Sequence, residues 1–305
     1  MGGGGRPVSF DLDAYLGERR RAVDEALDRY LPTADAYPAT IHEAMRYSVL
    51  AGGKRLRPTL VIAGAEAAEG RMADVMPTAC AFELIHTYSL IHDDLPAMDD
   101  DDYRRGRLTS HKVFGEAMAI LAGDALLTHA FGLVAANIRL GKAPAEVFPR
   151  LVAEISEAAG TAGMIGGQVV DVQSEGERVS AETLEYIHTH KTAALIRAAL
   201  RSGALLAGAS DPVLDALTRY GERLGLAFQI VDDVLDVEGS LEILGKTPGS
   251  DRRKKKITYP DYHGLDTSWD RARALIHEAR AAVAVLGPAA EPLGALAEFV
   301  LRRKA

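Results

Sequence analysis

The chain has 305 residues, of which 48% are hydrophobic and 26% charged, so it can bury one or two globular cores. Its net charge of −8 argues against a general nucleic-acid binder, because a phosphate backbone is held by an excess of lysine and arginine. The single cysteine, Cys80, cannot form an internal disulfide, and no secretory signal is visible, so we expect a cytoplasmic protein. The longest run without Asp, Glu, Lys or Arg, 125–138, is shorter than the roughly 18–20 residues of a membrane span, so none is predicted.

The segments that follow a glycine-rich leader at residues 1–9 are long and rich in alanine and leucine. Their apolar residues recur at helical spacing, and no alternating pattern typical of β-strands is visible. Glycine and proline predict helix borders, which in chain order fall at 31–32, 52–53, 96, 141–144, 166–167, 211–212, 245–249 and 287–288. We therefore predict an all-α fold in which residues 10–305 form one domain, a bundle of about ten or more helices.

Two groups of aspartates each follow an apolar helix. The first lies between Asp93 and Asp102, and Pro96 places its leading pair in the last helical turn. In the second, Asp232 and Asp236 are four residues apart and lie on one face of a helix. Oxygen-only clusters suit Mg²⁺ shared with substrate phosphates, and the alternative is a solvated acidic loop. Calcium and zinc are disfavoured, because neither an EF-hand pattern nor a local set of nitrogen and sulfur ligands is present.

Cationic residues are concentrated in a few places of this acidic chain. The segment 52–58, Gly-Gly-Lys-Arg-Leu-Arg-Pro, joins a helix end to a helix start, and 104–107, Arg-Arg-Gly-Arg, follows the first aspartates. Each has a simpler explanation: helix capping for the first, and neutralisation of neighbouring aspartates for the second. Together with Lys191, Lys246 and Lys256, they indicate two diphosphates held between carboxylate-bound Mg²⁺ and basic side chains.

These motifs, taken together, closely resemble the trans-polyprenyl diphosphate synthases, in particular the bacterial short-chain group that includes farnesyl diphosphate synthase (geranyltranstransferase). The resemblance covers nearly the whole chain and rests on residues 52–58, 89–99 with 104–106, 191–192, 228–236, 245–247 and 256–260. It implies an all-α homodimer of the isoprenoid-synthase type, with a helical bundle around a central cavity.

The resemblance also implies roles for individual residues. More than one Mg²⁺ ion would be bound by Asp93, Asp94, Asp99, Asp232, Asp233 and Asp236. The allylic diphosphate would be held by Arg104, Lys191 and Lys246. Isopentenyl diphosphate would be bound by Lys54, Arg57, His86 and Arg105, with Lys256 or the terminal residues 302–304 closing over it. Phe228, Gln229 and Thr192 would line the allylic site, with the oxygens of Gln229 and Thr192 facing a carbocation.

The implied reaction is a condensation of isopentenyl diphosphate with dimethylallyl or geranyl diphosphate. The allylic carbon–oxygen bond ionises, the alkene attacks the cation, and a proton is lost. The residues that would act directly in this chemistry are Asp93, Asp94, Asp232, Lys191, Thr192 and Gln229.

Product length is predicted from Tyr88, which precedes Asp93 by five residues and therefore lies about 7–8 Å further along the helix. A ring there, next to Ser89, would act as a floor for the growing tail and favour farnesyl diphosphate. A smaller side chain would favour geranylgeranyl diphosphate, and the alternative for Tyr88 is ordinary packing in the core.

The basic run 252–256 departs from the pattern of the family, which usually has small or acidic residues there. It is interpreted either as a solvated loop or as a mobile basic flap.

Other interpretations stay open at this point. Within the family, a geranyl or geranylgeranyl diphosphate synthase fits the same motifs. An HD-type metal phosphohydrolase would use the pair His92-Asp93 but would leave the second aspartate group and Gln229 unexplained. A non-catalytic subunit would have no need for two groups of mutually repelling carboxylates.

Overall fold

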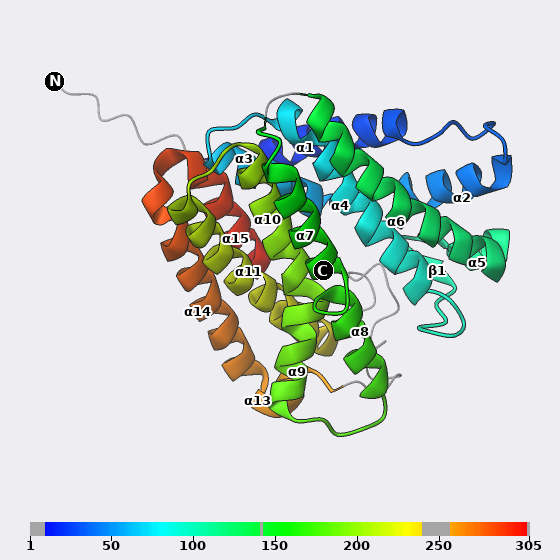
Figure 1. Ribbon diagram of the computed structural model, residues 1–305. Coiled ribbons are helices and arrows are strands. Elements are labelled where there is room, and N and C mark those ends of the chain that lie inside the picture. The colour runs from blue at the N-terminus through cyan, green and yellow to red at the C-terminus, as the bar shows by residue number, and fades with distance from the viewer. Residues whose placement is uncertain (1–9, 141–142, 240–256, 304–305) are drawn as a thin grey trace.

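The computed structural model describes residues 10–140, 143–239 and 257–303, and within them the chain is almost entirely helical (Figure 1). The all-α class and the expectation of ten or more helices are confirmed. Residues 1–9, the expected leader, lie outside the described residues.

The elements follow in chain order. They are α1 (Leu12–Tyr30), α2 (Ala39–Val49), α3 (Leu56–Ala67), α4 (Met72–Asp93), β1 (Tyr103–Arg104), β2 (Arg107–Leu108), α5 (Ser110–Phe114), α6 (Glu116–Arg139), α7 (Val147–Ala159), α8 (Met164–Gln173), α9 (Ala181–Ile187), the π-helix η1 (His188–Ala193), α10 (Ala194–Leu206), α11 (Asp211–Glu238), α13 (Tyr259–His263), α14 (Leu265–Val283), the 3₁₀-helix η2 (Ala284–Ala290) and α15 (Glu291–Arg302).

Several helix borders fall at the predicted breaks. Helix α1 ends at Tyr30, just before the Leu31-Pro32 pair, since proline disfavours a helical residue in front of it. Helix α11 begins at Asp211 and has Pro212 in its first turn, where the missing N–H has no helical partner to lose. Between α14 and α15, Gly287 has φ 67° and kinks the chain, as the Gly-Pro pair predicts.

Two local expectations are wrong. The break expected at 166–167 lies inside α8, and there glycine serves close packing: a Cβ on Gly167 would lie 2.3 Å from the backbone nitrogen of Lys191. Strands were not expected, but the two-residue strands β1 and β2 pair antiparallel. Arg105 and Gly106 between them have positive φ, which suits the turn of a tight hairpin.

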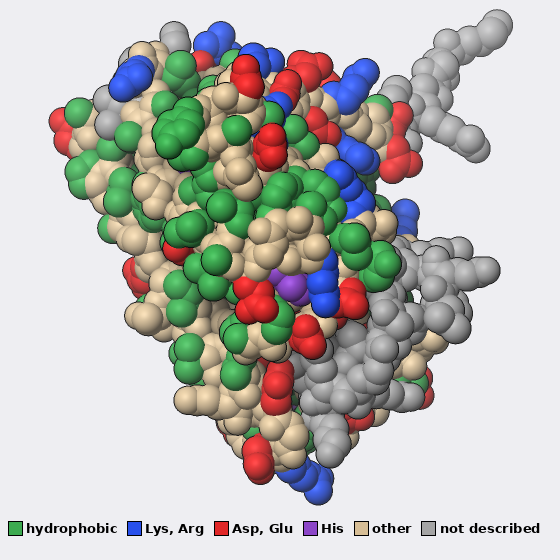
Figure 2. All heavy atoms as spheres, turned by 90° about the vertical axis from the view of Figure 1, so that its right-hand side faces the viewer, with side chains coloured by type: hydrophobic (Ala, Val, Ile, Leu, Met, Phe, Trp, Pro, Cys, Tyr) green, Lys and Arg blue, Asp and Glu red, His purple; other side chains and the backbone are tan. Residues whose placement is uncertain are grey.

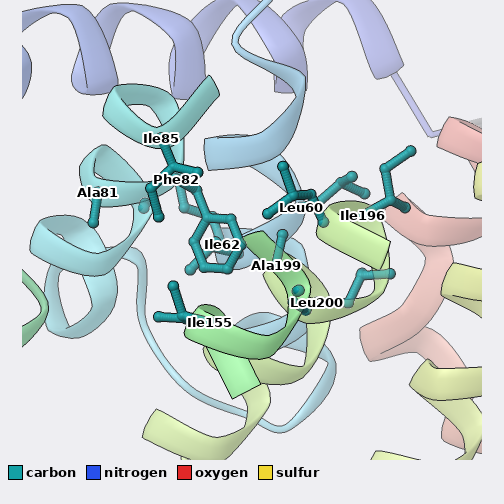
Figure 3. Packing of buried hydrophobic residues seen from close by; sticks show 14 of the residues in the cluster. Leu60, Ile62, Ala81, Phe82, Ile85, Ile155, Ile196, Ala199 and Leu200 are labelled. Atoms are coloured by element: carbon teal, nitrogen blue, oxygen red, sulfur yellow. The ribbon is translucent and has the colours of Figure 1, made fainter. Parts of the chain in front are cut away.

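The core is built around the crossing of α3 and α10. A Cβ on Gly203 would lie 1.8 Å from the carbonyl oxygen of Val61, so the two backbones approach as closely as glycine allows. Around this crossing, fully buried side chains such as Leu60 and Phe82 interdigitate (Figure 3). Each such side chain contributes about 1.5–3 kcal/mol through burial, so the scaffold beneath the acidic groups is rigid.

Helices α4 and α11 carry the two aspartate groups at their C-terminal ends. Helix α4 packs against α3 and α6, and α11 packs against α10 and α14. The scaffold therefore fixes where both groups point.

By length and composition alone, two described stretches, Glu116–Asn137 and Leu265–Arg302, could cross a membrane, but core helices of water-soluble proteins meet the same weak criterion. The second stretch contains the kink at Gly287. The absence of a membrane span stays a prediction.

Candidate active site

The first aspartate pair, at the end of α4, has one anchored carboxylate. Asp94 is 3% exposed, and its Oδ1 lies 2.6 Å from Nε and 2.5 Å from Nη2 of Arg104. The β1–β2 hairpin delivers this arginine to the helix end. Burial raises the pKa of Asp94, and the Arg104 guanidinium opposes that rise. The neighbouring Asp93 is only half-buried.

The loop after α4 turns back on the helix end. The N–H of Asp99 donates to the carbonyl of Asp93 at 2.7 Å, and the N–H of Asp100 donates to Leu95 at 3.1 Å. Asp100 takes φ 50° to allow this turn. The structure therefore brings Asp99 to the predicted first site.

Three other groups of this loop lie close together. Asp100, Asp102 and His111 each offer a ligand atom, and these atoms lie within 4.8 Å of one another. The ammonium of Lys112 lies 2.7 Å from Oδ1 of Asp102, so an ion pair already supplies a cation here.

The second aspartate pair, near the end of α11, shows the same division. The side chain of Asp232 is 55% exposed, whereas Asp233 is 6% exposed. Arg303 lies over this end of the site: its Nη2 is 3.2 Å from Oδ1 of Asp232 and donates to the carbonyl of Phe228 at 2.7 Å. Its guanidinium also stacks 3.8 Å from the centre of the Phe228 ring. Asp236 is half-buried.

The loop before α3 joins the two ends of the site. Arg105 of the hairpin donates to the carbonyl of Gly52. Burial and the charge of Arg303 lower the pKa of Lys54, and Asp232 opposes this, so Lys54 interacts with the second aspartate group. Lys54 and Arg105 are therefore brought to the region of the described aspartates.

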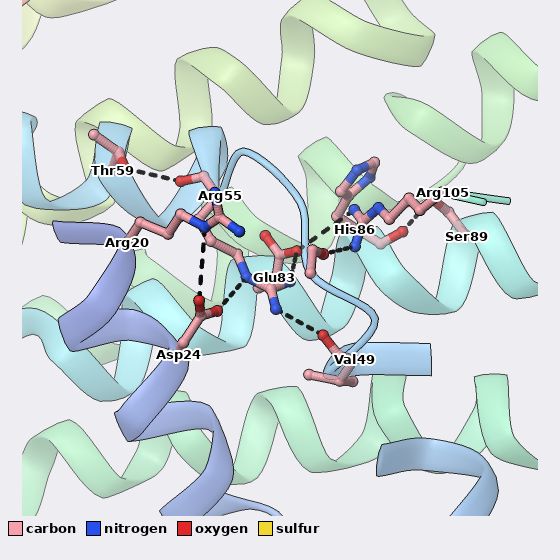
Figure 4. Close-up of polar contacts among 10 residues, drawn as sticks. Arg20, Asp24, Val49, Arg55, Thr59, Glu83, His86, Ser89 and Arg105 are labelled. Carbon is pink, nitrogen blue, oxygen red and sulfur yellow. Dashed lines mark hydrogen bonds and ion pairs between the residues drawn. The ribbon is translucent and has the colours of Figure 1, made fainter. Parts of the chain in front are cut away.

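Behind this loop lies a cluster of basic side chains around the carboxylates of Glu83 and Asp24 (Figure 4). The pKa of Arg57 is lowered to about 10, mainly by burial; the charge of Glu83 opposes this fall and that of Arg105 adds to it. Burial and the surrounding arginines hold the pKa of His86 well below its usual 6.5, so the ring is neutral near pH 7. The buried Nε of Arg57 has no hydrogen-bond partner in the described structure. The cluster is thus prepared for an anion.

Sequence reasoning included Arg55 only as part of the basic segment 52–58, and it missed Glu83 and the buried pairing of the two. Nη1 of Arg55 lies 2.5 Å from Glu83, Nε donates to Asp24 at 2.7 Å and Nη2 donates to Val49 at 2.8 Å. Arg55 has φ 49°, a left-handed conformation that turns it inward, while the other basic residues of its segment remain near the site. The signal was Glu83 itself, the only carboxylate of α4 between Asp74 and Asp93.

Lys191 and Thr192 lie in the π-helix η1, a wide turn that is frequent at functional sites. Nζ of Lys191 lies 2.7 Å from Asp171 of α8. The hydroxyl of Thr192 donates to Oε1 of Gln229 at 2.9 Å, and Nε2 of Gln229 donates to Asp233 at 3.2 Å. The structure thus joins Thr192, Gln229 and the second aspartate group through hydrogen bonds.

Tyr88 and Ser89 lie on α4 before the first aspartates. Tyr88 is 5% exposed, and its ring meets the ring of His92 edge-on at 5.7 Å. Burial and the charge of Asp93 raise the pKa of Tyr88 to about 12. Ser89 donates to the carbonyl of His86.

Lys246, Lys256 and the basic run 252–256 lie outside the described residues. Their predicted roles stay predictions.

Comparison with known proteins agrees with this geometry. The Polyprenyl synthetase family matches residues 38–286. A geranylgeranyl diphosphate synthase of Cyanophora paradoxa is 46% identical over 97% of this chain and 98% of its own length. A farnesyl diphosphate synthase of Geobacillus stearothermophilus is 49% identical over 83% of this chain and 84% of its own. In three dimensions, the geranylgeranyl pyrophosphate synthetase of Pyrococcus horikoshii superposes with a TM-score of 0.87 at 32% identity, over 96% of this chain and 98% of that one.

The protein is therefore a trans-prenyltransferase of isoprenoid biosynthesis that belongs to the polyprenyl synthetase family.

Proposed function

We propose that this prenyltransferase is a farnesyl diphosphate synthase, which adds isopentenyl diphosphate to dimethylallyl and then geranyl diphosphate. The observation that carries this proposal is the buried ring of Tyr88, five residues before Asp93 on α4. At 1.5 Å per residue the ring lies about 7–8 Å below the metal-binding rim, where it would stop a growing tail. The Geobacillus relative, named a farnesyl diphosphate synthase, supports the same product.

The cationic cluster supports binding of isopentenyl diphosphate. Arg57 and Arg105 lie near Glu83, a carboxylate that already pairs with Arg55, and burial lowers the pKa of both arginines. An incoming diphosphate would relieve their repulsion and give the Nε of Arg57 a partner. Lys54 at the mouth would reach the same diphosphate.

The aspartates fit Mg²⁺ at the other end of the site. Asp93, Asp99, Asp232 and Asp236 offer only oxygen atoms, the donors that this hard cation prefers. Bound there with the allylic diphosphate, Mg²⁺ would stabilise the negative charge of the leaving group.

The chain's own residues account for the rest of the mechanism. Arg104 and Lys191 hold the allylic diphosphate while its carbon–oxygen bond breaks and the electron pair leaves with the diphosphate. The oxygens of Thr192 and Gln229 face the carbocation. The alkene electrons of isopentenyl diphosphate form the new carbon–carbon bond, and the adjacent proton passes to an oxygen of the departed diphosphate.

We further propose a homodimer formed through the outer face of α6. Ile120 and Leu121 are 44% and 53% exposed there, and the same face carries small residues such as Ala117 and Gly132. The side of the molecule that carries α5 and α6 in Figure 1 shows many hydrophobic side chains in Figure 2. A second copy that covers this face would remove a large apolar area from water. Sedimentation of Leu121→Glu, which we expect to be monomeric, checks this against the wild type.

Product analysis tests the proposed function. The enzyme is incubated with Mg²⁺, isopentenyl diphosphate and, in separate reactions, dimethylallyl, geranyl or farnesyl diphosphate, and the dephosphorylated alcohols are separated by chromatography. We expect a fifteen-carbon alcohol from the two shorter primers and no extension of the farnesyl primer. A twenty-carbon product would favour the second candidate, geranylgeranyl diphosphate synthesis, to which the Cyanophora relative points. No elongation with any primer would reject both.

A further inference from the structure

Asp233 lies in a buried hydrogen-bond network that is separate from the open carboxylates. Its Oδ2 accepts a hydrogen bond from the backbone N–H of Tyr259 at 2.8 Å and lies 3.2 Å from Nε2 of His188. Its Oδ1 accepts from Nε2 of Gln229 at 3.2 Å. Asp233 and His188 are 6% and 4% exposed, so the network is largely dry. Both carboxylate oxygens are therefore already occupied by protein donors.

This network determines which way the Gln229 amide points. An ionised carboxylate only accepts hydrogen bonds, so the NH₂ end of the amide must face Asp233. The oxygen end then faces Thr192, whose hydroxyl donates to it at 2.9 Å. If the carboxylate were lost, either end of the amide could face Thr192.

His188 holds the carboxylate from the π-helix. It lies three residues before Lys191 and four before Thr192, and the wide turn of η1 presents all three to the site. Tyr259, at the start of α13, holds the same oxygen from the other side. Asp233 is thus fixed by three elements: η1, α11 and α13.

We propose that Asp233 and His188 are positioning residues that fix the Gln229 amide with its oxygen toward the allylic cation, rather than part of the metal site. This inference rests on the proposed function. Asp232, one residue earlier and 55% exposed in its side chain, remains the metal-binding member of the pair. A buried carboxylate that accepts from two N–H groups, with the ring of His188 3.2 Å away, has little capacity left for a cation, whereas the exposed Asp232, 3.2 Å from Arg303, remains open to solvent.

Substitution of Asp233 by asparagine tests the inference most directly. Asparagine keeps the volume of the aspartate but replaces one of its oxygens with an NH₂ donor. That donor meets either the amide of Gln229 or the backbone N–H of Tyr259, so the Gln229 amide loses its preferred orientation. We expect kcat of Asp233→Asn to fall by about 10²-fold, as for a small misplacement in an active site, with KM for both substrates nearly unchanged. The double variant Asp233→Asn/Gln229→Leu should lose no more kcat than Gln229→Leu alone, because Asp233 acts through Gln229.

A readout other than activity separates positioning from metal binding. Electron paramagnetic resonance counts the Mn²⁺ ions bound in the presence of inorganic diphosphate. We expect Asp233→Asn to bind as many ions as the wild type and Asp232→Asn to bind fewer. Equal losses of bound Mn²⁺ in both variants, or multiplying losses of kcat in the double variant, would overturn the inference.

His188 is tested by rescue. Gln at position 188 places an N–H donor near the position of Nε2, so His188→Gln should retain most of the activity that His188→Leu loses. His190→Leu is the matched control, since His190 lies in the same turn but stacks on Tyr186 and leaves Asp233 untouched. Equal activity of the Gln and Leu variants would contradict the role. A wild-type enzyme that elongates no primer would instead refute the proposed function, while the Mn²⁺ count would still test the assignment of Asp233.

Discussion

The ends of α4 and α11 carry the same pair of adjacent aspartates but anchor them differently. In each pair the first carboxylate faces the site and the second is buried, because consecutive helical residues point about 100° apart. Asp94 is anchored by a cation, the guanidinium of Arg104. Asp233 is anchored by backbone and amide N–H donors, with the ring of His188 beside them. The buried carboxylate of the first pair is therefore balanced by a cation, and that of the second mainly by hydrogen bonds.

This difference suits the two ends to different tasks. A charge-balanced end remains stable before substrate arrives, and it keeps Arg104 close to where a diphosphate would bind. A hydrogen-bonded end fixes the amide of Gln229, which in the proposed mechanism faces the reacting carbon. Four substitutions would break or sharpen the comparison.

The largest effect is expected at the open carboxylate of the second pair. Asp232→Ala should lower kcat/KM by about 10²–10³-fold, the cost of removing one contact to the charge that develops in the transition state. Steady-state kinetics with geranyl diphosphate measures this. Its unfolding midpoint should stay near that of the wild type, because the side chain is largely exposed. Asp215→Ala, an exposed position on the same helix, is the control, and near-normal turnover of Asp232→Ala would reject the metal assignment.

Removal of the Arg104 guanidinium, which anchors Asp94 of the first pair, should lower the free energy of unfolding. Arg104→Gln leaves the buried carboxylate of Asp94 without its charge partner, which costs about 3–5 kcal/mol in comparable buried pairs. Urea unfolding measures the loss. The double variant Asp94→Asn/Arg104→Gln, which also removes the buried charge, should be more stable than Arg104→Gln alone. A single variant as stable as the wild type would show that Asp94 is not held by charge.

The helices also differ five residues before the first member of each aspartate pair, where α4 has Tyr88 and α11 has Ala227. Tyr88→Ala should shift the main product from fifteen to twenty carbons, because it opens the path along α4. Chromatography of the products checks this, with Tyr88→Phe as the control that keeps the ring. An unchanged product in the Ala variant would remove Tyr88 as the floor.

The smallest effect is expected from pH, at His86 behind the first pair. Burial and neighbouring arginines hold its pKa well below 6.5, so below pH 6.5 the unfolded chain takes up a proton that the folded chain does not. This residue should therefore lower the free energy of unfolding as pH falls, by about 1 kcal/mol between pH 6.5 and 5.5. Urea unfolding at both pH values should show a smaller loss for His86→Gln. The same loss in both proteins would contradict the shifted pKa.

The sequence predicted the fold class and several helix borders, because helical periodicity and proline or glycine breaks are local signals. It could not show that Gly167 lies inside a helix, because this glycine is required by the close approach of the Lys191 backbone in η1, which is distant in sequence. Nor could it separate Asp232 from Asp233. Their difference in burial comes from η1 and α13, which approach α11 only in the folded chain. Arg55 and Glu83 were missed for the same reason, as partners 28 positions apart.

The contact of Arg303 with Asp232 and Phe228 has a practical consequence for protein production. An affinity tag fused after position 305 would be separated by only two residues from Arg303, whose side chain lies in the mouth of the site. We expect such a tag to disturb catalysis through this contact. A tag before Phe10 avoids that contact, and kinetic comparisons between variants are best made on that form.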